Sequence, residues 1–196
     1  MDPQMHDLSA RTAVVSPLRP AYLAGAALSL CVMVGAIISE NAWLQNFIHV
    51  MSGLLWTDID LFMGFVIGPI LRRSALEVRN AVVTALVPRT LILMPVLSIV
   101  SSTSGWFLAK QMGFLDVSYP GILWVYGALV IVTILSIQGL GILLPTNLRI
   151  YFEIQKPQID NAKIDRWMRR YVRVVASQGV MQVAIIVVMA RFSTGL

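Results

Sequence analysis

The stretch HVMSGLLWTDIDLFMG, residues 49–64, lies inside a longer apolar run, 44–71, that ends at Arg72 and Arg73. An α-helix rises about 1.5 Å per residue, so this run is long enough to cross a hydrocarbon core about 30 Å thick. It nevertheless carries one histidine and two aspartates. We therefore expect a transmembrane helix whose polar side chains are hidden inside a bundle.

Four further apolar runs of similar length account for most of the chain. They cover residues 21–39, 90–108, 121–144 and 172–189. Apolar residues make up 57% of the 196 residues and charged residues only 13%, and the mean hydropathy of +0.76 is well above that of soluble proteins. The sequence predicts an all-α integral membrane bundle of five transmembrane helices, forming a single domain over 1–196.

Lysine and arginine are unevenly divided among the segments that join these runs. Of the 15 basic residues, all but Lys110 and Arg191 lie in segments 1–20, 72–89 and 145–173. Since basic residues concentrate in cytoplasmic loops, five spans with the N-terminus inside and the C-terminus outside explain the alternation. We expect a multi-pass protein of a bacterial or archaeal cytoplasmic (inner) membrane. The same bias explains the net charge of +5, so nucleic acid is not an expected partner.

The basic segment 158–171 has the pattern of a short amphipathic helix, with Asp160 at the N-cap position. Its apolar positions are Ile164, Trp167, Met168 and Tyr171, and its basic positions are Lys163, Arg166, Arg169 and Arg170. Two interpretations are open. The segment either lies on the cytoplasmic face against lipid head groups or extends the fifth transmembrane helix.

The polar residues of the second run fall on two sides of its helix. At about 100° per residue, His49, Gly53, Trp56 and Asp60 form one narrow stripe, whereas Asp58 points to nearly the opposite side. The two carboxylates therefore cannot share one site on this helix. Gly53, and Gly64 further along the same stripe, leave gaps where another helix or a flat ligand can approach closely.

Asp60 needs a partner, because a charged side chain at mid-membrane depth costs about 2.5–3.5 kcal/mol. We expect it to be protonated or hydrogen-bonded within the bundle. The candidate partners are Ser98, Ser101, Ser102, Ser104, Gln138, Gln178 and Gln182. The polar residues Asp58, Asp60, Gln138, Gln178 and Gln182 are candidate functional residues, and hydrogen bonds that hold the helices together explain them equally well.

His49 is the one histidine within the predicted spans. A lone imidazole can ligate haem iron or copper, or it can form a hydrogen bond between helices. With no second histidine in the spans, the other metal ligand has to be a methionine such as Met33 or Met51, a carboxylate, water or another chain. The single cysteine, Cys31, lies in an apolar run and provides no cysteine-based motif.

A resemblance to known membrane families rests on the spacing His49-x6-Trp56, in a helix that ends in Gly-Pro-x-Leu-Arg-Arg at 68–73. This spacing resembles the His-x6-Trp signature of the bacterial copper-resistance D membrane proteins, the membrane-bound protoporphyrinogen IX oxidases and the urate-oxidase membrane anchors. The similarity covers about 44–109 and the fifth run. It implies a helical bundle in which His49 binds haem b or copper. The lysine that the oxidases carry in a following helix has no counterpart here, since Lys110 stands at the other end of that helix.

Two functional hypotheses follow. In the first, the chain binds haem b or copper through His49, next to Gly53 and Trp56, and serves electron transport or metal handling. In the second, it is a non-catalytic accessory subunit without a cofactor, which contacts the lipid bilayer and other membrane subunits or a second copy of itself. The sequence leaves open whether the chain is an enzyme.

The charge asymmetry gives a testable topology. A reporter that is active only in the cytoplasm should be silent when fused after Leu196, because the C-terminus is expected outside. The same reporter fused at residue 157, in the basic segment 145–173, should be active. An active C-terminal fusion would rule out this orientation.

Overall fold

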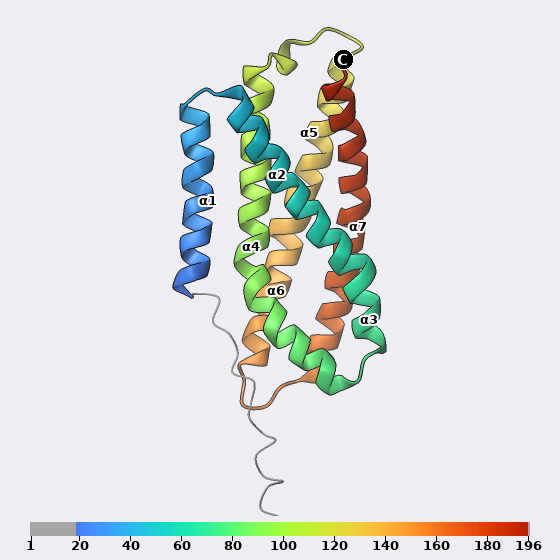
Figure 1. Cartoon of the computed structure of the whole chain (residues 1–196). Coiled ribbons are helices and arrows are strands. Elements are labelled where there is room, and N and C mark those ends of the chain that lie inside the picture. The colour runs from blue at the N-terminus through green and yellow to red at the C-terminus, as the bar shows by residue number, and fades with distance from the viewer. Residues whose placement is uncertain (1–18, 196) are drawn as a thin grey trace, which may run out of the picture.

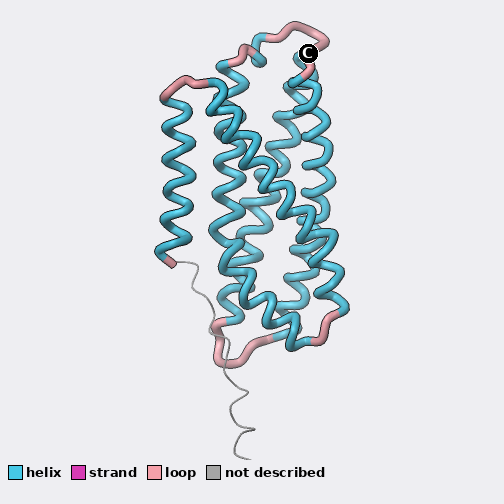
Figure 2. Tube along the Cα trace, in the orientation of Figure 1, coloured by secondary structure: helices cyan, strands magenta, loops and turns pink. Residues whose placement is uncertain are grey.

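Five helical rods, each long and apolar enough to cross a membrane, make up the computed structural model, which describes residues 19–195. No strand is present in this range (Figure 2), which confirms the predicted all-α membrane bundle. The rods are α1 (Pro20–Ile38), Ala42–Arg73, α4 (Leu76–Gln111), Ile122–Ile154 and α7 (Asn161–Ser193). Three residues between the fourth rod and α4 form a short 3-10 turn, η3 (Phe114–Asp116).

The second and fourth rods each contain a widened π-helical segment. The second consists of α2 (Ala42–Leu61), η2 (Phe62–Ile67) and α3 (Gly68–Arg73), and the fourth of α5 (Ile122–Ser136), η4 (Ile137–Leu143) and α6 (Leu144–Ile154). Both π segments end two residues before a proline, Pro69 or Pro145. A proline ring clashes with the carbonyl four residues earlier and offers it no N–H. A wider turn relieves that clash and allows the rod to continue.

The rods pack around α4 and α7, as Figure 1 shows. The second rod crosses the bundle diagonally and contacts α4 along its first half and α7 along its second half, whereas α1 stands at the edge against α4 and α2. The first residues of α1 and the last residues of α7 lie at opposite ends of the bundle, as an odd number of spans requires. Which end faces the cytoplasm stays a prediction.

The observed helices differ from the predicted ones at the basic end of the bundle, where segments 72–89 and 145–173 lie. The third helix begins at Leu76 rather than near residue 90, and the fourth ends at Ile154 rather than at residue 144. The prediction ended these helices where charges begin, but a helix can run past the hydrocarbon core because its backbone hydrogen bonds are internal. Of segment 158–171, residues 161–171 are likewise part of the fifth helix, which begins at Asn161. The interpretation of a separate helix along the membrane surface is therefore wrong, and the extension is correct.

These extensions pack against one another at the basic end. Arg79 at the start of α4 forms an ion pair with Asp165 of α7, at 2.9 Å between Nη2 and Oδ1. The side chains of Asn80 and Asn161 are hydrogen-bonded at 3.0 Å. A buried apolar cluster lies beneath these contacts, made of Leu71, Val83, Val87, Leu91, Ile150, Ile154, Ile164 and Met168. The basic end is therefore a packed part of the fold and not a set of loose loops.

Candidate functional site

His49 lies at the interface between α2 and α4. Its Nδ1 is 2.9 Å from the backbone carbonyl oxygen of Ser101, so that nitrogen carries the proton and donates it. Nε2 has no hydrogen-bond partner among residues 19–195, and it is not enclosed by the protein. The imidazole is therefore held in one orientation with its second nitrogen available.

Two glycines allow the imidazole and the two helices to come together. A Cβ added to Gly105 would stand 2.5 Å from Cε1 of His49, and one added to Gly53 would stand 3.1 Å from Oγ of Ser101. Helix α4 therefore packs directly against Gly53, and no open space remains there for a ligand. Gly53 serves close packing between helices, which is one of the two uses the sequence suggested.

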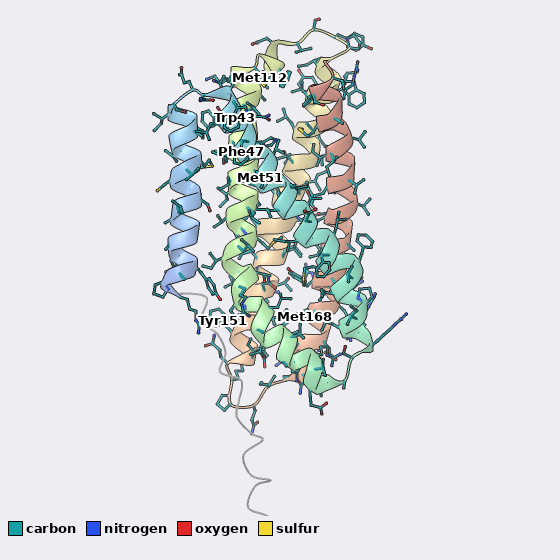
Figure 3. All side chains as sticks on the ribbon, in the orientation of Figure 1. Trp43, Phe47, Met51, Met112, Tyr151 and Met168 are labelled. Atoms are coloured by element: carbon teal, nitrogen blue, oxygen red, sulfur yellow. The ribbon has the colours of Figure 1, made fainter. Side chains whose placement is uncertain are left out.

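Trp56 lies in the core and does not form a wall beside His49. Its side chain is only 6% exposed and packs with Leu97 and Leu135. On the other side of α2 from His49, the rings of Trp43 and Phe47 stack with 5.7 Å between centroids. Figure 3 shows both residues on the first turns of α2, followed by Met51. All three are exposed, and together they offer an apolar surface to lipid or to another chain.

The two aspartates of α2 point to different sides, as the periodicity predicts. Asp60 is 1% exposed, and its Oδ2 accepts a hydrogen bond of 2.9 Å from Nε2 of Gln182 on α7. Asp58 is exposed on the outside of the bundle. The partner of Asp60 is therefore a glutamine of the fifth helix and not a serine of the third.

Close packing between the second rod and α7 makes this contact possible. A Cβ on Gly64 would stand 3.1 Å from the backbone Cα of Ala176, and one on Gly179 would stand 2.8 Å from Cδ2 of Leu61. A larger residue at Gly64 would force the backbones apart. The glycines bring the two helices near enough for the short Asp60 side chain to reach Gln182.

The other two predicted glutamines have different surroundings. Gln178 is fully buried and donates a 2.9 Å hydrogen bond to the carbonyl oxygen of Leu135, across to α5. Gln138 is partly buried in η4, and its Oε1 has no partner among residues 19–195. Gln178 and Gln182 lie one turn apart on α7, so they belong to one site. Gln138 forms no hydrogen bond with Asp60 among the described residues.

Three further polar residues of this site are not among the predicted site residues. Tyr171 and Asn147 are 4% exposed, Thr90 is 7% exposed, and Asn147 Nδ2 lies 3.3 Å from Oγ1 of Thr90. The prediction placed these residues at or beyond the ends of helices, where polar side chains meet water. Longer helices put them inside the bundle. A search for polar positions at helical spacing on both sides of the basic segments would have found them.

A small cavity lies among these residues, between α2, α4, α6 and α7. Its volume is about 20 Å³, counted as space for the centre of a water molecule, which is room for roughly one water. Its polar wall is formed by Trp56, Thr90, Ser98, Asn147, Tyr171 and Gln178. The cavity is far too small for a porphyrin, and His49 does not line it.

No family model, curated protein or solved structure matches this chain. Among residues 19–195, no three His, Cys, Asp or Glu side chains come close enough to hold a metal ion by themselves. The resemblance carried by His49 and Trp56 therefore stays a prediction.

The contact between Asp60 and Gln182 predicts unequal effects of two substitutions. Asp60→Asn keeps a polar partner for the Gln182 amide, whereas Asp60→Leu leaves that amide buried without an acceptor, at a cost of about 1–3 kcal/mol. The thermal unfolding midpoint in detergent should fall clearly for Asp60→Leu and little for Asp60→Asn. Equal midpoints for the two variants would contradict a structural role of this hydrogen bond.

Proposed function

We propose that the chain is a redox or metal-handling protein of a bacterial or archaeal inner membrane, with Nε2 of His49 as a ligand of haem b iron or copper. The observation that supports this proposal is the fixed imidazole, with Nδ1 bonded to the Ser101 carbonyl oxygen and Nε2 free. Histidines that ligate metals usually donate their other N–H to a carbonyl or carboxylate. That bond selects the tautomer, aims the free nitrogen and raises its basicity.

The bound group would sit at the edge of the interface between α2 and α4, because the His49 ring packs against Gly105 of α4. Phe47 precedes His49 by two residues, about 200° around the helix, and stacks with Trp43, so this apolar surface lies on the other side of α2 and would not contact the bound group. Met51 is two residues after His49, about 200° around the helix, and so it cannot complete the same ligand set. The remaining ligand would be water or a residue from another chain, which agrees with the expectation of an oligomer.

Replacing His49 with alanine should abolish the binding of haem or copper. The wild type, purified through a tag without histidine from haem-replete and copper-replete cells, should show Soret absorbance or copper content that His49→Ala lacks. His6→Ala, which removes the chain's other histidine, is the matched control and should keep it. A wild type that carries neither group, or a His49→Ala variant that keeps it fully, would exclude the ligand role.

The second candidate function is that of a non-catalytic accessory subunit, and the position of Asp58 favours it. The second rod runs from Ala42 to Arg73, and Asp58 lies at its middle on the exposed side. It has no ion-pair or hydrogen-bond partner among the described side chains. A carboxyl facing lipid at this depth is costly, so a donor from another subunit or a second copy of this chain would stabilise it.

Asp58→Leu should weaken such an assembly without harming the fold. In mild detergent, the wild type should have a molar mass above that of one chain, 21.6 kDa, and Asp58→Leu should shift it toward that mass. The thermal midpoint should not fall, because Asp58 makes no contact inside the bundle. Asp116→Leu, at an exposed acid in a connection, is the control and should leave the mass unchanged. A wild type with the mass of one chain would argue against an assembly through this face.

A further inference from the structure

The strongest unassigned feature of the molecule is an excess of hydrogen-bond acceptors around Asp60. Three oxygens have no partner among the described residues although they are enclosed, namely Oδ1 of Asp60, Oε1 of Gln178 and Oε1 of Gln182. All three side chains are at most 1% exposed. Buried acceptors without donors are unfavourable, because each has lost its water and gained nothing in return. Apart from the Trp56 indole, which lies near the Asp60 carboxyl, the described residues offer these oxygens no donor.

We propose that Asp60 is a proton-exchange site inside the membrane, and that water in the neighbouring cavity connects it to the basic end of the bundle. A proton on Asp60 turns one acceptor oxygen into an O–H donor and removes a negative charge from the bilayer interior. This proposal does not depend on metal binding at His49, which faces α4 on an earlier part of α2.

The surroundings of Asp60 favour a proton over a larger cation. No positively charged side chain of the described residues pairs with it, and α2 turns its other acid, Asp58, to the outside. The groups that α7, α4 and α6 place in this region are neutral: Gln178, Gln182, Tyr171, Ser98, Thr90 and Asn147. The neighbouring cavity has room for about one water molecule, which is too little for a hydrated metal ion. A proton can reside on Asp60 and leave through water.

The cavity passes close to the Asp60–Gln182 pair. Trp56 precedes Asp60 by one turn of α2, Gln178 precedes Gln182 by one turn of α7, and both Trp56 and Gln178 line the cavity. The proposed exchange requires a side chain of the cavity wall, such as Gln178, to move so that water reaches the carboxyl.

The other end of the cavity approaches the basic end of the bundle. Thr90 follows Arg89 on α4, and Asn147 lies two residues before Arg149 on α6. Both arginines are exposed. The polar side chains of Thr90 and Asn147 therefore stand between the cavity and the charged surface, where they can hydrogen-bond to a passing water.

The exchange itself is a simple proton transfer. The Asp60 carboxylic acid gives its proton to the oxygen of the cavity water, the O–H electron pair stays on the carboxylate, and hydronium forms. The Gln182 Nε2–H that already donates to Oδ2 stabilises the carboxylate. Reprotonation follows the same path in reverse, and no further reactant is needed.

Infrared spectroscopy of the whole chain in liposomes tests the site. The spectrum of the wild type minus that of Asp60→Asn should contain the C=O band of a protonated carboxyl, and this band should shift in D2O because the proton exchanges. Asp58→Asn is the matched control and should keep the band. Asp60 present as carboxylate at every pH, or a protonated band that does not shift in D2O, would overturn the proposal.

A second comparison tests the route. Asn147→Leu replaces a polar group on the cavity wall with an apolar one of similar size and should slow the D2O shift of the Asp60 band several-fold. Thr146→Val changes the preceding residue, whose hydroxyl bonds only to its own helix at Ile142, and should leave the rate unchanged. Equal rates in Asn147→Leu and wild type would exclude this cavity as the path.

Discussion

The hydrogen bond between Gln182 and Asp60 joins α2 to α7 at a depth where lipid offers no hydrogen bonds. In hydrocarbon, a polar side chain has to find its partner inside the protein, and this constraint arranges the bundle. The backbones approach closely at Gly64 and Gly179, which allows a short carboxylate to reach across. The amide of Gln178 ties α7 to α5 in the same way. One face of α7 is thus hydrogen-bonded to both α2 and α5.

The second rod has three polar positions with three different environments. His49 is held by α4 and keeps one ring nitrogen free, Asp60 is enclosed against α7, and Asp58 faces outward. The diagonal course of this rod across the bundle explains the difference, because its first half packs on α4 and its second half on α7 (Figure 1). A ligand, an exchangeable proton and a partner subunit can therefore be accommodated on one helix without competing for the same space.

Helix length explains why the polar cluster extends to the basic end. The rods continue past the hydrocarbon core and pack through the Arg79–Asp165 ion pair and an apolar cluster beneath it. Thr90, Asn147 and Tyr171 consequently lie between the charged surface and the membrane interior. The π-helical turns before Pro69 and Pro145 keep the rods continuous through this region. Buried polar side chains thus extend from the charged end of the bundle to the Asp60–Gln182 pair.

The sequence by itself determined the five spans, the all-α class and the opposite directions of Asp58 and Asp60, because apolar run length and helical periodicity are local properties. It also named His49, Asp58, Asp60 and three glutamines as candidates within the spans, without choosing among the possible partners of Asp60. Only the tertiary structure decided that Asp60 pairs with Gln182, that α4 fills the gap at Gly53, and that Trp56 lies in the core. These outcomes depend on which helices are neighbours and how closely they approach. In a bundle with several equivalent serines and glutamines, the spacing along one chain contains no such information.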